Sequence, residues 1–218
     1  RDLLPSVASG QRILAFACTE PDYGWGPDHV NLAATRRNRG FVLNGTKLFV
    51  PDLQVADQLV VVARTSKAAS PEEGITLFLV DKSTPGVSTR IVRGWTGEKL
   101  NQVVFKDAQV PASAVIGQVD GGWAPAERVL DRATIIMCAY IVGGLQRVLD
   151  ITVEYCHTRI AFGVPIGTFQ RVQDHVINIV NDLEAARWTT YEALWKLDAG
   201  RPDAPLAISM AKAVASEG

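Results

Sequence analysis

The sequence predicts an α+β fold in which an antiparallel β-barrel or sandwich is followed by an up-down helical bundle. From Ile13 to Ile116, short apolar runs alternate with turn signals, which is typical of strands. From Pro125 onward, apolar residues recur at i, i+3 and i+4, which is typical of helices with one buried face. We therefore predict a β domain over residues 1–118 and a helical domain over residues 119–218.

Four apolar segments predict the strands of the β domain. In GFVLNGTKLFV, the dipeptide Asn44-Gly45 lies between β-prone flanks, and Asn-Gly favours a two-residue hairpin turn, so we predict a hairpin there. QLVVVART and GITLFLVDKSTPGV are further strands, and the second ends at Pro85-Gly86. NQVVFKDAQVP alternates apolar and polar residues until Pro111. Short strands at this spacing suit an antiparallel sandwich or barrel.

Three helical segments follow. The first carries an apolar face across residues 129–155, and the second across residues 172–194. Gly200 and Pro202 end the second helix, and Asp203 caps a third helix that runs to the end of the sequence. Three helices leave an up-down bundle incomplete, so we expect a fourth beyond residue 218.

Charge and composition exclude several classes of partner. The formal net charge is -1, and the basic residues are scattered, so we expect no nucleic-acid partner. The longest apolar stretch, residues 134–145, is interrupted by glycines and is shorter than the ~18 residues of a membrane span, so we expect no membrane insertion. Cys18, Cys138 and Cys156 lie in apolar surroundings, which suits buried thiols in the cytoplasm. Neither the cysteines nor the histidines show metal-like spacing.

Five segments of the chain carry recognisable motifs, namely CTEPDYGWG, LNGTKLFVPD, VVFKDAQVPASAVIG, DRATIIMCAYIVGG and TRIAFGVPIGTFQ. In this order they resemble the acyl-CoA dehydrogenase family, flavoenzymes built from a helical domain, a β domain and a helical bundle. The resemblance covers nearly the whole chain. It implies FAD as cofactor, an acyl-CoA substrate, an electron-transfer flavoprotein as acceptor, and a dimer or tetramer of like or unlike subunits. It also implies a role in fatty acid or lipid catabolism, and a chain without the family's N-terminal helical domain and the end of its bundle.

The resemblance implies contacts to the flavin ring from two segments. These are Phe16, Cys18 and Thr19 on one side, and Phe49, Val50 and Pro51 on the other. Thr19 matches the threonine that meets the pyrimidine edge. Pro51 replaces a serine or threonine that hydrogen-bonds the reactive flavin nitrogen, and proline has neither a hydroxyl nor a backbone N–H to offer. The alternative is an ordinary strand end with a turn at Glu20-Pro21.

The joint between the first two long helices is a second candidate for cofactor binding. The resemblance implies that Arg159 pairs with the pyrophosphate of a neighbouring subunit's flavin through charge-assisted hydrogen bonds. It also implies that Phe162, Phe169 and Gln170 belong to the same cofactor site, with Phe162 packed at the joint. In the alternative, Arg159 only complements the helix dipole, and the glycines and prolines only break the chain. Both interpretations can hold together.

Three residues match positions near the substrate. Trp25 stands where the family often has a serine that touches the acyl-CoA, so an indole there would narrow the channel or stack on an unusual acyl group. Asp131 and Thr134 match an Asp-x-x-Arg segment near the pantetheine and acyl groups, in which the arginine has become threonine. The alternative for Asp131 is a solvated carboxylate near the start of a helix.

The family removes a proton from the substrate Cα with a carboxylate while hydride leaves Cβ for the flavin. In most members the base follows the third bundle helix. A minority place it at the position matched by Ala133, which closes that route here, and Glu127 lies on a different face. We therefore predict part of an acyl-CoA dehydrogenase whose chain, as given, lacks the catalytic carboxylate. A non-catalytic subunit of a heterotetramer is one alternative, which Pro51 and Trp25 favour, and a protein-interaction module is another.

Overall fold

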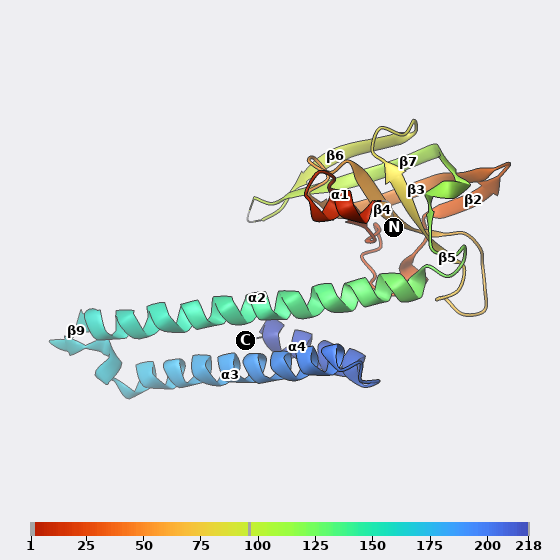
Figure 1. Cartoon of the computed structure of the whole chain (residues 1–218). Coiled ribbons are helices and arrows are strands. Elements are labelled where there is room, and N and C mark those ends of the chain that lie inside the picture. Colours follow the sequence, from red (N-terminus) through yellow and green to blue (C-terminus); the bar gives the residue numbers. More distant parts are fainter. Residues whose placement is uncertain (1–2, 96, 218) are drawn as a thin grey trace. The chain divides into compact units, whose positions relative to one another are not determined.

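The computed structural model describes residues 3–95 and 97–217, which Figure 1 shows as a sheet and a group of long helices. The chain divides into two compact units, one ending at Glu127 and the other beginning at Arg128. The first unit contains the sheet, and the second contains most of the helical residues. The predicted fold class is confirmed, with one difference in strand direction.

The described residues of the first unit form one sheet of eight strands. Its order is β6 (Val87–Arg93), β7 (Lys99–Pro111), β3 (Gly40–Pro51), β2 (Ala33–Arg37), β4 (Gln58–Arg64), β5 (Ile75–Asp81) and β8 (Val115–Ile116), with β1 (Leu14–Ala17) also paired with β4. Most neighbours are antiparallel, as predicted. However, β1 and β2 both run parallel to β4, so the sheet is mixed. Parallel neighbours need a long connection, which hairpin signals cannot reveal.

Alternating side chains of the sheet build the core of the β unit. On β3 the buried apolar side chains include Phe41, Leu43 and Val50, and on β5 Phe78 is fully buried. The rings of Phe41 and Phe78 meet edge to face, with their centroids 5.0 Å apart. Three short helices accompany the sheet, namely α1 (Leu4–Ala8), η1 (Pro27–His29) and η2 (Ala112–Ala114).

The hairpin predicted at Asn44-Gly45 is wrong, because both residues lie inside β3. The turn that joins β2 to β3 is Asn38-Arg39, with Asn38 at a φ of 48°. Gly45 has a φ of 146° at a shift in register between β3 and β7. A Cβ there would lie 3.0 Å from the Cα of Leu32, so glycine is needed for close backbone approach.

The helical unit has three long helices within the part of the chain described, as predicted. These are α2 (Trp123–Thr158), α3 (Gln170–Asp198) and α4 (Ala204–Glu217). The first turn of α2 belongs to the β unit, and α2 and α3 run side by side (Figure 1). Between α2 and α3 the chain forms β9 (Ile160–Ala161), β10 (Val164–Pro165) and η3 (Ile166–Thr168).

Small side chains dominate the core of the helical unit. Ile135 and Cys138 of α2 meet Ala186 and Ala193 of α3, and α4 contributes further alanines. Alanine side chains are small, so a core built from them is filled only where the helices pack closely together. A hydrogen bond of 2.5 Å from Arg187 Nη2 to Gln146 Oε1 also ties α3 to α2.

α2 is long and apolar enough, by length and composition alone, to cross a membrane. Its best 18-residue window has a mean hydropathy of 1.4, so the expectation that every apolar stretch is too short for a span is wrong. That expectation treated the glycines in residues 134–145 as interruptions. Glycines within a helix do not make an 18-residue window of that helix polar, so the apolar part of α2 is longer than expected. One such helix is weak evidence for a membrane span, because core helices of soluble proteins pass the same test.

Packing of α2 into the helical core can be tested with adjacent isoleucines. Ile135 is 1% exposed and Ile136 is 66% exposed. We expect Ile135→Val to lower the free energy of unfolding by about 0.5–1.5 kcal/mol through the lost methylene and the residual cavity. Ile136→Val is expected to change it by less than about 0.5 kcal/mol. Urea unfolding followed by circular dichroism measures both, and equal losses would show that the face of Ile136 is also buried in solution.

Candidate functional site

β3 contains a bulge between Lys47 and Val50, where it gains one residue relative to β7. Within this bulge, Phe49 has a φ of 53°, a left-handed conformation that bulky residues seldom adopt. Its ring is 40% exposed and stacks on Tyr23 with a centroid distance of 6.0 Å. The bulge therefore presents an aromatic surface outside the core, and backbone strain of this kind clusters at functional sites.

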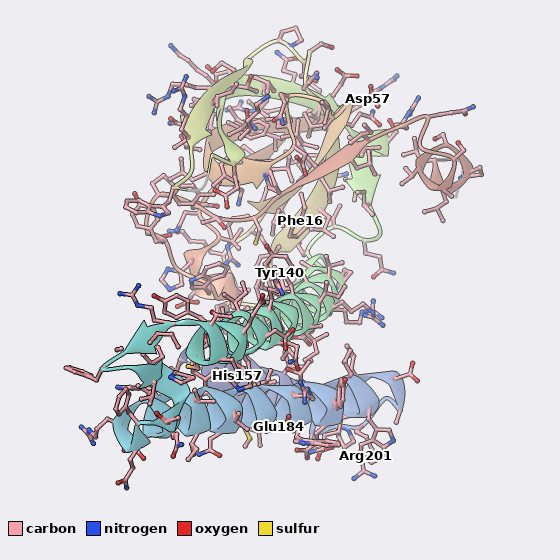
Figure 2. The ribbon with its side chains drawn as sticks, turned by 90° about the vertical axis from the view of Figure 1, so that its left-hand side faces the viewer. Phe16, Asp57, Tyr140, His157, Glu184 and Arg201 are labelled. Carbon is pink, nitrogen blue, oxygen red and sulfur yellow. The ribbon has the colours of Figure 1, made fainter. Side chains whose placement is uncertain are left out.

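The segment after β1 lies directly beside this bulge. Phe16 lies on β1 (Figure 2), and Cys18 and Thr19 follow it, all three half-buried. The amide of Leu48 donates a hydrogen bond of 2.8 Å to the carbonyl of Thr19. The Thr19 hydroxyl has no protein partner among residues 3–95 and 97–217, so it is available to a ligand. The two predicted flavin-contact segments are thus neighbours in the fold.

Val50 and Pro51, both predicted to contact the flavin, present different atoms to a ligand. The side chain of Val50 is 1% exposed and lies in the core, so only its backbone could meet a ligand. Pro51 is exposed at the end of β3, and its nitrogen carries no hydrogen. The assignment of both residues to the cofactor stays a prediction.

A buried ion pair lies beneath these segments. Lys47 Nζ is 2.7 Å from Glu20 Oε1 and donates to the Cys18 carbonyl at 2.8 Å. The Lys47 side chain is 0% exposed and that of Glu20 is 5% exposed. Burial lowers the pKa of Lys47, and the Glu20 carboxylate opposes this shift, whereas burial raises the pKa of the Cys18 thiol. Glu20 and Lys47 lie in the motifs CTEPDYGWG and LNGTKLFVPD, but the sequence alone predicted no role for either residue.

Trp25 lies in the loop between β1 and β2 and is 80% exposed. The same loop is held by Asp22, whose Oδ2 lies 3.0 Å from His29 Nδ1. This hydrogen bond raises the pKa of His29 and lowers the pKa of Asp22. The role of Trp25 against a substrate stays a prediction.

In the helical unit, the joint after α2 is a β-hairpin with Phe162-Gly163 at its turn. Their φ angles of 53° and 83° are those of a two-residue hairpin turn. Phe162 is 96% exposed, so within this chain it does not pack at the joint as expected, and its assignment to the cofactor stays a prediction. The turn directs the ring outward, and it only meets the edge of Phe169 at a centroid distance of 6.1 Å.

Arg159 has a fixed backbone and a free side chain. Its amide donates to the Tyr155 carbonyl and its carbonyl accepts from the Ile166 amide, both at 2.9 Å. Its guanidinium is exposed and has no hydrogen-bond or ion-pair partner within the described part of the chain. Gln170, the first residue of α3, is exposed as well. The joint therefore gathers a cation, two aromatic rings and an amide.

A groove of about 480 Å³ between α2 and α4 contains both predicted substrate residues of the helical unit. Asp131 and Thr134 line it together with Ser209, Lys212 and Ser216. Lys212 Nζ hydrogen-bonds the Ser216 hydroxyl. Burial raises the pKa of Asp131, and Arg132 opposes this shift. The three α4 residues were not predicted, because each is an ordinary helix-surface residue in the sequence.

Thr19 and Arg159 belong to different compact units, so their expected cooperation on one cofactor stays a prediction. No group of three or more His, Cys, Asp or Glu side chains in the described residues is arranged to hold a metal ion.

Two protein-family models match this chain. Residues 15–108 match the protein-family model of the acyl-CoA dehydrogenase middle domain, and residues 120–218 match that of the acyl-CoA dehydrogenase C-terminal domain. The chain is 34% identical to L-prolyl-[peptidyl-carrier protein] dehydrogenase from Serratia sp., over 98% of this chain and 56% of that protein.

Two solved structures are similar over 99% of this chain. Butyryl-CoA dehydrogenase from Megasphaera elsdenii has a TM-score of 0.88 and 30% identity, and 57% of its chain is covered. A structure of PigA with FAD and proline has a TM-score of 0.89 and 34% identity, again with 57% of its chain covered. The chain thus spans about half the length of the relatives that it matches.

Proposed function

The chain belongs to the acyl-CoA dehydrogenase family, and we propose that it is part of an FAD-dependent dehydrogenase that oxidises an acyl thioester to its 2,3-enoyl form. The observation that carries this proposal is the strained aromatic bulge at Phe49, which lies beside the backbone of Thr19, a residue whose hydroxyl has no partner in the described part of the chain. The relatives are named for different substrates, among them a prolyl group on a peptidyl-carrier protein and butyryl-CoA. We propose acyl-CoA as the substrate class. Acyl thioesters on carrier proteins are a second class of substrate that the protein could accept.

The residues present fit a flavin dinucleotide. Such a ligand needs apolar walls for its ring, hydrogen bonds for its pyrimidine edge and cations for its pyrophosphate. Phe16 and Phe49 supply half-exposed rings, Thr19 a hydroxyl without a partner, and Arg159 a guanidinium without a counter-ion in the described chain. When bound, FAD supplies a hydride acceptor.

The roles of this chain's own residues are binding and orientation. Phe49 and Phe16 would exclude water, the Thr19 hydroxyl would hold a polar edge, and Arg159 would bind phosphate oxygens. Asp131, Thr134 and Lys212 line a polar groove suited to the amides and hydroxyl of a pantetheine arm. We assign no proton-abstracting base, since Ala133 has only a methyl group where the resemblance implies a carboxylate in a minority of family members.

The proposal predicts that the intact protein purifies with a yellow flavin. Anaerobic addition of butyryl-CoA, or of a prolyl-loaded carrier protein, is expected to bleach the flavin absorbance. Colourless protein that fails to bind added FAD would overturn the proposal. Flavin that no acyl thioester bleaches would overturn the dehydrogenase activity and leave the cofactor assignment standing.

Pro51 favours a second candidate, a non-catalytic subunit of a mixed assembly. Its ring nitrogen cannot donate a hydrogen bond at the end of β3, where the resemblance implies a contact to the reactive nitrogen of the flavin. Co-expression with a homologous subunit separates the two candidates. Flavin bound only in the mixed complex would support this one, and flavin bound by the protein alone would exclude it.

We further propose that the protein assembles as a dimer or tetramer, works in the cytoplasm and passes electrons to an electron-transfer flavoprotein. The free guanidinium of Arg159 supports assembly, because a cation without a partner on an exposed hairpin is available to a neighbouring copy. Light scattering of the purified protein measures the assembly, and a monomer with bound FAD would contradict it.

Phe162 offers a test in which stability and cofactor affinity change in opposite directions. Its φ of 53° and 96% exposure mean that Phe162→Asn should relieve strain and raise the free energy of unfolding by about 0.5–1 kcal/mol. If the ring contacts the cofactor, FAD affinity falls in the same variant. Urea unfolding and FAD titration measure the two effects, and higher stability with unchanged affinity would remove Phe162 from the site.

A further inference from the structure

A contribution to stability does not by itself explain why the Lys47–Glu20 ion pair is buried. With the two side chains 0% and 5% exposed, it is almost completely removed from water. Buried ion pairs contribute little net stability, because the loss of hydration cancels much of their attraction, and apolar residues of similar volume often serve as well. A pair buried this deeply is therefore better explained by the geometry that it imposes.

The pair joins three backbone segments. Glu20 Oε1 accepts the amides of Asn31 and Leu32 at 3.0 and 2.9 Å, besides the ammonium of Lys47 at 2.7 Å. Lys47 also holds the carbonyl of Cys18 at 2.8 Å. One carboxylate oxygen and one ammonium thus fix the segment after β1, the start of β2 and the middle of β3.

These fixed points lie immediately beside the candidate flavin contacts. Cys18 and Glu20 flank Thr19, and Lys47 precedes the bulge that carries Phe49. On the far side of the bulge, Asn101 is 2% exposed and donates from Nδ2 to the Val50 carbonyl at 3.2 Å. The bulge is therefore held on both sides by buried polar side chains.

We propose that Lys47 and Glu20 are positioning residues of the flavin site, whose ion pair sets the separation and orientation of Thr19 relative to Phe49. The inference rests on the proposed function, since it assumes that these two residues contact the cofactor. Directional bonds suit this task, because apolar packing tolerates small shifts that a hydrogen-bonded ion pair does not.

The test uses the intact protein and added FAD, with two variants. Glu20→Gln keeps an oxygen that can accept the amides of Asn31 and Leu32 but removes the charge. Glu20→Gln combined with Lys47→Met removes the pair without leaving a buried charge. The matched control is Phe78→Leu, which weakens the core of the same unit on β5, a strand that does not pair with β3 in the described sheet.

Three readouts separate positioning from general weakening. We expect the double variant to raise the dissociation constant of FAD about tenfold, the scale seen when outer hydrogen-bond partners of metal ligands are removed. Its bound flavin should lose the fine structure of the visible spectrum. In FAD-free protein, the Leu48 amide, which bonds the Thr19 carbonyl, should exchange faster with solvent. Phe78→Leu should leave the spectrum and FAD affinity unchanged.

Failure of the inference and failure of the proposed function give different results. Wild-type protein that binds no FAD overturns the function, and faster Leu48 exchange in the variants would still show that the pair positions the two segments. Wild-type protein that binds FAD, with a folded double variant matching its affinity, spectrum and exchange, overturns the inference alone. If the double variant does not fold, Glu20→Gln decides the question by the same three readouts, because its amide oxygen and the Cys18 carbonyl can still accept hydrogen bonds from the Lys47 ammonium.

Discussion

Replacing Lys47 by Met is expected to lower the free energy of unfolding by about 3–5 kcal/mol, because Glu20 would keep its charge in the core without a cation. Glu20 is 5% exposed, so water cannot replace the lost ammonium without opening the loop that follows β1. The two backbone amides that Glu20 accepts would remain its only described hydrogen-bond donors. Urea unfolding followed by circular dichroism measures the loss.

Lys106→Met is the matched control for this substitution, because Lys106 is an exposed residue of the neighbouring strand β7. We expect it to change the free energy of unfolding by less than about 0.5 kcal/mol. Adding Glu20→Gln to Lys47→Met should recover part of the loss by removing the unpaired charge. A loss below about 1 kcal/mol for Lys47→Met alone would mean that the pair is solvated, contrary to its burial.

The strands were predictable where local pattern decides the structure. β4 and β5 are apolar segments bounded by turns. β4 forms close to its predicted limits, whereas β5 ends at Asp81, before the predicted end at Pro85-Gly86. The parallel pairing of β1 with β4 was not predictable, because the two strands are joined by distant contacts and no local signal reports their direction. At Asn44-Gly45 the local signal was present but misleading. The dipeptide favours a turn, yet pairing of β3 with β7 keeps it inside a strand.

The candidate site was predicted from family motifs, and its assignment stays a prediction. The resemblance implied that Thr19 and Phe49 contact one cofactor, and the Leu48–Thr19 hydrogen bond shows that their segments are neighbours. Burial of Lys47 could not be read from the sequence, because a lysine in a strand is usually solvated and only tertiary contacts with Glu20 make burial tolerable. The resemblance implied that Phe162 packs at the joint, whereas the residue occupies the exposed turn of a hairpin.

Replacing Arg159 by Ala is expected to raise the dissociation constant of FAD by about 30-fold or more, which corresponds to about 2 kcal/mol for a lost charge-assisted contact to phosphate. The guanidinium has no partner in the described chain, so its removal breaks no contact there and should not unfold the hairpin. Equilibrium titration of the FAD-free intact protein with FAD measures the change. Arg159→Lys should recover only part of the affinity, since an ammonium lacks the bidentate geometry of guanidinium.

Arg171→Ala is the matched control, because Arg171 is 91% exposed, carries the same charge and lies on the first turn of α3, where its only described ion pair is with Asp174 at 3.5 Å. We expect it to leave FAD affinity unchanged. If Arg159 served only to complement the dipole of α2, its removal would cost about 0.3–1 kcal/mol of stability and no affinity. Unchanged FAD binding in Arg159→Ala would therefore favour that interpretation and exclude the joint after α2 from the cofactor site.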